Sequence, residues 1–517
     1  MLVLFLIVSG SCTDGFENSN PNEATEEMMD RDDLRIGSFF SQMLRKVFIV
    51  GEGFDADYQI TQNLAGDIWS GYMGACGLWY SNSNNTTYNL ISHWYDAAFN
   101  SSFTNVMAPW SSIRDFTKES FPQKYALATI VKVAGMHRVT DMYGPLPYTS
   151  FGGGSLKNPY DGQKEVYDTF FKELDEAVGI LTDFNEKSPG AKALSSDYDF
   201  IYGGQVVNWI KFANSLRLRL AMRIAYADPA RARQEAEAAV NHPVGVMTMA
   251  GDAAALNKSN RLSYRHPLYV ICYEFTDVKM GATMDSYLNG YNDPRIGSYF
   301  VRNSKDGVFR GIRTGIQINN KADYAEGPFS PLNVTPESAV VWMNAAEVHF
   351  LRAEGALRGW NMGGTAREFY EAGVRTSFSF VGAGNADGYL ADDTSVPAAY
   401  TDPVRAGNST AARGTITIKW DDGAAAEQQL ERIITQKWIA LYPDGQEAWS
   451  EFRRTGYPKV FPVVVNNSGG KISTDIQVRR LPFPSTEYRD NSANMTGAVN
   501  LLGGADTGGT KLWWDKK

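Results

Sequence analysis

The sequence has few of the residues that build metal and redox sites. Its 517 residues include three cysteines, Cys12, Cys76 and Cys272, and five scattered histidines. There is no CxxC pair, and no two histidines have the spacing that places two metal ligands on one face of a helix. We therefore expect neither a metal site nor a cofactor. Spacing does not decide whether Cys76 and Cys272 form a disulfide, which an oxidising exterior would permit.

Positive charge is also scarce. The chain has 49 basic and 58 acidic residues, which gives a net charge of −9 and a pI near 5.3. A protein whose main partner is nucleic acid needs a basic stripe to neutralise phosphates. The composition therefore predicts no nucleic-acid partner, and ordinary solubility explains the acidic balance equally well.

The short motifs of the common enzyme classes are missing. The chain contains no GxSxG, no HExxH and no P-loop. A glycoside hydrolase needs only two carboxylates about 5 to 10 Å apart. With 58 acidic residues, the sequence leaves open whether such a pair exists. We predict a protein that is not an enzyme. The alternative is a surface glycosidase, and the purified protein would then release product from a polysaccharide.

The most apolar run of the chain stands at its start and is short. The sequence MLVLFLIVSGS ends at Cys12, which is the pattern of a lipoprotein signal followed by the cysteine that becomes acylated. The run is too short to span a bilayer. It departs from the usual pattern because no Lys or Arg precedes it and Ser9 stands where Leu is commoner. We predict a signal over residues 1–12, a lipid anchor at Cys12 and a flexible acidic tether over 13–33. The alternative is a frayed apolar terminus with an ordinary thiol.

Helical periodicity dominates the rest of the chain. Between Gln205 and Asn241, apolar residues recur at helical spacing, then Asp228 and Pro229 suit the cap and first position of a second helix. Neither helix can bury its apolar stripe alone, which is the logic of a helical repeat. Similar spacing predicts further helices over 34–50, 98–116, 124–139, 165–184, 337–360, 366–376 and 428–442.

The segments between these helices are rich in turn-forming residues. Residues 250–329 are high in Gly, Asn, Asp and Tyr, with a strand-like piece over 311–318, and residues 381–414 are high in Gly, Ala, Asp, Ser and Thr. The tail from 443 to 517 is loop-like. We predict a mainly α fold: an irregular tetratricopeptide-like helical scaffold with a loop-rich lobe. In a single domain over 34–510, the repeat helices take about 34–245, 337–378 and 428–442, and the lobe takes about 246–336 and 379–510.

Several sequence blocks occur in a specific order. They are HRVTDMYGPLPYTS (137–150), WIKFANSLRLRLAM (209–222), YNDPR (291–295), EVHFLRAEGALRGW (347–360), QKWIALYPDGQEAWSEFRRTGYP (436–458) and RRLPFPSTEY (479–488). Together, over about 26–495, they resemble the SusD/RagB family of outer-membrane nutrient-binding lipoproteins of Bacteroidetes. Pro145 stands where the family commonly has Asp. The resemblance implies a SusD-like helical fold, anchoring on the outer face of the outer membrane, and a SusC-like TonB-dependent transporter as partner. It also implies a glycan ligand, or sometimes a peptide.

Two surface segments have the composition of a sugar site. A sugar presents an apolar C–H face, which an aromatic ring can cover, and hydroxyls, which amide and carboxylate groups can bind. The stretch WYSNSNNTTY (79–88) offers both, with Trp79, Tyr80, Asn82 and Asn84 as candidates. The alternative is that Trp79 and Tyr80 pack under their loop as core.

The second candidate segment is 269–291, where Tyr273 and Phe275 are the proposed ligand contacts and packing of the lobe is the alternative. A third aromatic segment, 319–329, contains Tyr324 and Phe329. Other conspicuous residues suit structural roles. These are an ion pair between Asp293 and Arg295, core tryptophans 209, 342, 438 and 449, and a buried network of Glu447, Arg453 and Arg454.

The sequence as a whole favours a lipid-anchored protein on the cell surface that captures an oligosaccharide and delivers it to a transporter in the outer membrane. Two alternatives stay open. One is an assembly or lid subunit of the transporter without its own sugar ligand, and the other is a peptide-binding member of the same family.

Overall fold

The computed structural model describes residues 33–51, 55–155, 157–259 and 261–517. Helices make up about half of it, and the few strands are short, so the mainly α prediction is confirmed. The predicted signal, Cys12 and almost all of the tether lie outside the described residues. Within the described ranges, no helix is both long and apolar enough to cross a bilayer.

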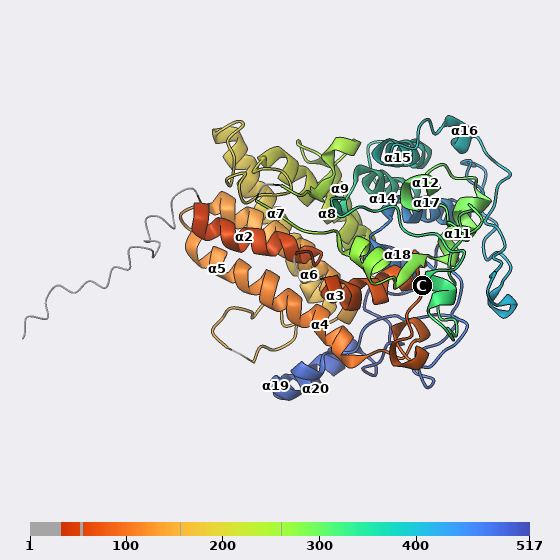
Figure 1. Cartoon of the computed structure of the whole chain (residues 1–517). Helices are drawn as coiled ribbons and strands as arrows, with labels where there is room; N and C mark the ends of the chain where they lie inside the picture. The colour runs from red at the N-terminus through yellow and green to blue at the C-terminus, as the bar shows by residue number, and fades with distance from the viewer. Residues whose placement is uncertain (1–32, 52–54, 156, 260) are drawn as a thin grey trace, which may run out of the picture.

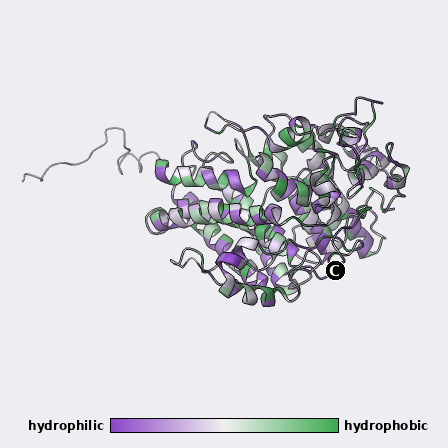
Figure 2. Ribbon diagram, turned by 60° about the horizontal axis from the view of Figure 1, so that its bottom comes forward, coloured by the Kyte–Doolittle hydropathy of each residue, from purple (hydrophilic) through white to green (hydrophobic). Residues whose placement is uncertain are grey.

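The long helices pack in sequential pairs (Figure 1). They are α2 (Leu34–Val47), α4 (Ser92–Ser102), α5 (Ala108–Thr117), α6 (Pro122–Tyr143), α7 (Gln163–Lys187), α8 (Val206–Arg223), α9 (Pro229–Asn241), α14 (Ala345–Leu357), α15 (Ala366–Val381), α17 (Ala426–Leu441), α18 (Gly445–Thr455) and α20 (Ser492–Leu502). Helices α6 and α7, α8 and α9, and α14 and α15 are neighbours, while α14 also contacts α8 and α17. Figure 2 shows hydrophobic and hydrophilic residues mixed within individual helices, as expected where each helix buries one face.

Shorter elements lie between the long helices and in the loop-rich part. They are α3 (Asp55–Tyr58), α10 (Pro267–Tyr269), α11 (Ala282–Gly290), α12 (Ile296–Tyr299), α13 (Ala322–Ala325), α16 (Asp387–Leu390) and α19 (Ser485–Asp490), with π-helical turns at η2 (Gln59–Asp67), η5 (Phe103–Met107) and η7 (Val270–Glu274). The domain boundaries drawn from the sequence stay a prediction.

The α8–α9 pair forms as its sequence predicts. The Asp228 side chain accepts a hydrogen bond from the Arg231 amide, and Pro229 takes the first helical position, where no N–H is needed. Ala232, Ala236 and Ala239 are fully buried, because small side chains let α9 approach α8 closely. The four tryptophans at 209, 342, 438 and 449 are core residues as expected.

The short strands make two antiparallel pairs. β1 (Met73–Ala75) pairs with β3 (Val278–Met280), so that Ala75 faces Val278, and β2 (Ala254–Leu256) pairs with β4 (Val340–Met343). The predicted helix over 337–360 is therefore wrong at its start, where β-branched Val340 and Val341 pair with β2. The strand-like piece 311–318 forms only one bridge, from Ile312 to Gly281.

The tail was also expected to lack helices, and this is wrong for α18, α19 and α20. Every residue of α18 is buried although its sequence is mostly polar, because its charged side chains are paired inside the protein. A search for apolar residues at helical spacing therefore misses it. Its start is nevertheless capped, because the Asp444 side chain accepts a hydrogen bond from the Glu447 amide.

Buried ion pairs join the helices at the centre. Arg223 contacts Glu447 at 2.5 Å and Glu451 at 2.7 Å, and Arg454 bridges Glu451 at 2.7 Å and Glu354 at 2.6 Å. Glu447 and Arg454 belong to this network as predicted, whereas Arg453 is buried and donates to the backbone carbonyls of Asp141 and Arg479. Elsewhere Arg295 pairs with Asp293 at 2.6 Å, both fully buried, as the sequence suggested.

Candidate functional site

The loop that follows β1 contains a left-handed turn. Tyr80, Ser81 and Asn82 have φ of 52°, 53° and 66° in succession. This region costs a residue with a side chain roughly 1–2 kcal/mol. Three such residues in a row persist only where surrounding contacts hold them, and backbone strain of this kind is concentrated at functional sites.

Asn82 and Asn84 supply those contacts. The Asn82 amide exchanges two hydrogen bonds with the Ile318 backbone, at 2.8 and 3.2 Å. Asn84 donates to the Trp79 carbonyl at 2.8 Å and accepts from the Thr86 amide at 2.9 Å. Both asparagine side chains are buried, with 6% and 1% of their surface exposed. Their amide groups are thus engaged within the protein and hold the turn.

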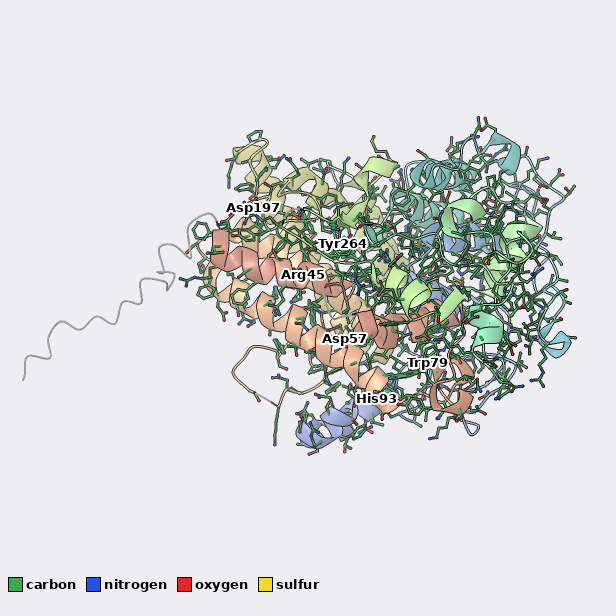
Figure 3. The ribbon with its side chains drawn as sticks, in the orientation of Figure 1. Arg45, Asp57, Trp79, His93, Asp197 and Tyr264 are labelled. Carbon is green, nitrogen blue, oxygen red and sulfur yellow. The ribbon has the colours of Figure 1, made fainter. Side chains whose placement is uncertain are left out.

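The turn carries Tyr80 outward. Its side chain is 52% exposed, whereas Trp79 is only partly exposed. Tyr80 packs edge-on against Trp94, with ring centroids 5.8 Å apart, and its hydroxyl lies 3.4 Å from His93 Nε2. Trp79 meets Trp94 from another side at 6.3 Å. Trp94 is buried at the start of α4, so it anchors an aromatic cluster of Trp79, Tyr80, His93 and Trp94, two of which are labelled in Figure 3.

Gly77 makes room for the Trp79 ring. A Cβ atom at position 77 would lie 2.4 Å from Trp79 Cη2, closer than any real contact. The indole therefore lies directly over the Gly77 backbone, which fixes its position beside Trp94. His93, Trp94 and Gly77 were not among the candidates. The His-Trp pair at 93–94 was the available signal, because it adds aromatic side chains next to a candidate loop.

The second candidate segment lies at the same end of the β1–β3 pair as the Tyr80 loop. The strands are antiparallel, so the chain entering β3 lies beside the chain leaving β1, and the Cys76 amide donates to the Asp277 carbonyl at 2.7 Å. Tyr273 and Phe275, just before β3, are 38% and 37% exposed. The Tyr273 hydroxyl donates to the Leu332 carbonyl at 2.5 Å, and partial burial raises its pKa to about 12, so it stays neutral.

Residues 318–321 connect the two candidate loops. Ile318 binds Asn82, and Lys321 donates to the Phe275 carbonyl and to Asp277 Oδ1, both at 2.7 Å. The ion pair with Asp277 neutralises Lys321, and Arg265 is likewise paired with Glu274 at 2.7 Å. The rings that face outward therefore stand among balanced charges, which suits an uncharged ligand.

The third aromatic segment is core. Tyr324 and Phe329 are each 2% exposed and stack on one another with centroids 5.4 Å apart, in a small cluster with Cys76 and Ile312. Cys76 and Cys272 are free and buried, and burial raises the pKa of both thiols. No group of three or more potential metal ligands lies together in the described part of the chain.

Comparisons with known proteins agree along the whole chain. The family described as SusD and RagB outer membrane lipoprotein matches residues 17–515. A chitin-binding SusD homolog from Flavobacterium johnsoniae is 44% identical, with a TM-score of 0.90 over 93% of this chain and 99% of that one. SusD homologs from Bacteroides vulgatus and Bacteroides uniformis are 37% and 40% identical, with TM-scores of 0.88 and 0.86, each over 94% of this chain and 98% and 100% of theirs. No curated protein matches the chain.

Proposed function

This chain belongs to the SusD-like family of outer-membrane lipoproteins, and from that membership we propose that it binds a glycan at the cell surface. The observation that carries the proposal is Tyr80, an exposed ring held on a braced left-handed turn beside His93 and Trp94. A rigid aromatic ring covers the C–H face of a sugar with little loss of conformational entropy.

The neighbouring groups suit the hydroxyls of the same sugar. The His93 ring and the Tyr80 hydroxyl can donate or accept hydrogen bonds at the edge of the cluster. Tyr273 and Phe275 offer further exposed rings at the same end of the β1–β3 pair. We assign Asn82 and Asn84 a supporting role, because their amides are already bonded within the loop.

The chitin-binding homolog suggests which sugars to test first. That protein is 44% identical to this chain, so N-acetylglucosamine chains are the first candidates. The N-acetyl group adds a methyl and an amide to a pyranose, and both suit an uncharged aromatic surface.

Further elements of the proposal come from the family. We propose that Cys12, outside the described residues, is acylated and holds the protein on the outer face of the outer membrane. The bound glycan would then pass to a SusC-like TonB-dependent transporter. Since binding and transfer need no bond to break, the proposed role is capture without catalysis.

The test is calorimetric titration of the chain with oligosaccharides of N-acetylglucosamine and a panel of plant and host glycans. Tyr80→Ala is expected to weaken binding about tenfold, since loss of one stacked ring costs about 1.4 kcal/mol or more. Phe121→Ala is the control, because Phe121 is equally exposed, at 47%, but begins the remote α6 helix. If no glycan in the panel binds, the proposal is contradicted and the assembly alternative is favoured. If a peptide binds instead, the peptide alternative is favoured.

A further inference from the structure

A second aromatic hollow lies at the far end of α4. A cavity of about 370 Å³ is lined by residues of α4, η5 and α19 and by Pro147, Phe151 and Asn158. Its floor consists of Phe99, Phe103 and Phe151. The Phe99 and Phe103 rings are 4.6 Å apart, and Phe103 and Phe151 are 5.7 Å apart. Phe103 and Phe151 are partly exposed and form an apolar platform for a sugar ring, while Phe99 is only 3% exposed and packs against Phe103.

The rim of this hollow is rich in hydrogen-bond acceptors. The Asn158 Oδ1 atom is buried and has no hydrogen-bond partner among the described residues, although buried acceptors are nearly always paired. The loop around it is fixed, because the Asn158 backbone carbonyl accepts hydrogen bonds from Asn491 and Asn494 at 3.0 and 3.2 Å. A donor supplied by a ligand would satisfy this oxygen.

Glu487 adds a second acceptor. Its Oε2 accepts from the Tyr160 hydroxyl and from Asn491, both at 2.9 Å, which orients the carboxylate. The other carboxylate at the rim, Asp490, is paired with Arg489 at 2.7 Å. An apolar floor below hydroxyl-binding acceptors fits the amphipathic surface of a pyranose and does not fit an anion.

Helix α4 links this hollow to the Tyr80 cluster. His93, Asn100 and Thr104 follow one another at i, i+7 and i+11, so they share one face of the helix, and all three are exposed. At 1.5 Å per residue, His93 and Asn100 are roughly 10 Å apart along the helix axis. In Figure 1, α19 lies below α4, with which it is in contact.

We propose that the Phe99–Phe103–Phe151 hollow is a second subsite for an uncharged oligosaccharide. A chain bound at Tyr80 would run along the exposed face of α4 and place a further sugar ring on the phenylalanine floor. This inference rests on the proposed function. It predicts that affinity depends on chain length, because only a chain that spans α4 can occupy both subsites.

The test is a calorimetric series on the full chain, with N-acetylglucosamine oligomers from the disaccharide to the hexasaccharide. Phe151→Ala is the first variant, since Phe151 is only partly buried on a loop. We expect it to weaken hexasaccharide binding about three- to tenfold, as for one lost aromatic contact, and to leave disaccharide binding unchanged. Asn158→Ala should act in the same direction, while Phe116→Ala, an exposed control on α5, should change neither.

The outcomes separate this subsite from the proposed function. If Tyr80→Ala weakens every oligomer and Phe151→Ala weakens none, the protein binds glycan but the second subsite is refuted. If wild-type affinity does not rise with length, the subsite is also refuted. If no oligomer binds at all, the proposed function fails for these glycans and this inference fails with it. A hexasaccharide-specific loss in both Phe151→Ala and Asn158→Ala supports the subsite.

Discussion

Removing Arg454 should destabilise the protein severely. This guanidinium is fully buried and donates four hydrogen bonds, two to Glu354 and two to Glu451. Burial alone would raise the pKa of Glu451, but the charges of Arg454, Lys437 and Arg223 hold it well below its usual range. Arg454→Met fills a similar volume and leaves two buried carboxylates without their principal cation.

The expected cost follows from that missing charge. Breaking a buried ion pair by removing one partner costs roughly 3–5 kcal/mol, which is a large part of the roughly 5–15 kcal/mol that stabilises a folded domain. An exposed pair is worth much less. Arg367 and Glu371 make such a pair on α15, with 55% of the arginine side chain exposed, so Arg367→Met should cost far less stability than Arg454→Met.

Urea unfolding, followed by circular dichroism at neutral pH, compares the two variants. The Arg454→Met midpoint should fall by several times the change in Arg367→Met. Adding Glu354→Gln to Arg454→Met should recover part of the loss, because it removes one of the stranded charges. Equal midpoints for both single variants, or a double variant less stable than Arg454→Met, would refute the view that the cost is uncompensated charge.

Two further predictions concern Asp67 and Gly77. Burial raises the pKa of Asp67 to about 7 from 3.8, so the folded chain keeps this proton between about pH 4 and 7 while the unfolded chain loses it, and stability falls as pH rises through that window. Because Asp67→Asn cannot ionise, its urea midpoint relative to wild type should be higher at pH 8 than at pH 4. The same difference in midpoint between variant and wild type at both pH values would contradict this. Gly77→Ala should displace the Trp79 ring and so weaken glycan binding with a changed near-ultraviolet circular dichroism spectrum. Gly497→Ala, where a Cβ meets nothing within 4 Å, should leave both unchanged, and a normal spectrum for Gly77→Ala would count against the close packing.

The fold could be predicted where apolar residues recur at helical spacing. Helices α8 and α9 gave both a periodic stripe and the Asp228 cap. Helix α18 was missed because its sequence is mostly polar, and its charges are neutralised by residues such as Arg223 that lie far away in the sequence. The strand over 340–343 depends on its pairing with β2, far away in sequence, which no local pattern reports.

The composition of the candidate site could be predicted from the sequence, but the role of each of its residues could not. The sequence located the loop with Trp79 and Tyr80, but asparagines that suit sugar hydroxyls suit a backbone turn equally well. Only the contact with Ile318, 236 residues away, shows that Asn82 serves the turn. Likewise Tyr324 and Tyr80 are the same residue type, and only the folded structure shows that 2% of Tyr324 and 52% of Tyr80 are exposed.

The residues of the loop that contains the braced turn have two separate roles. Leu78, Tyr80 and Ser81 face solvent, whereas Asn82 and Asn84 make the bonds that set the backbone. Replacing an outward residue should therefore alter what the surface recognises and leave the loop's shape intact. Under the proposed function, single substitutions at these outward positions would change the ligand contacts without disturbing the hydrogen bonds that hold the turn.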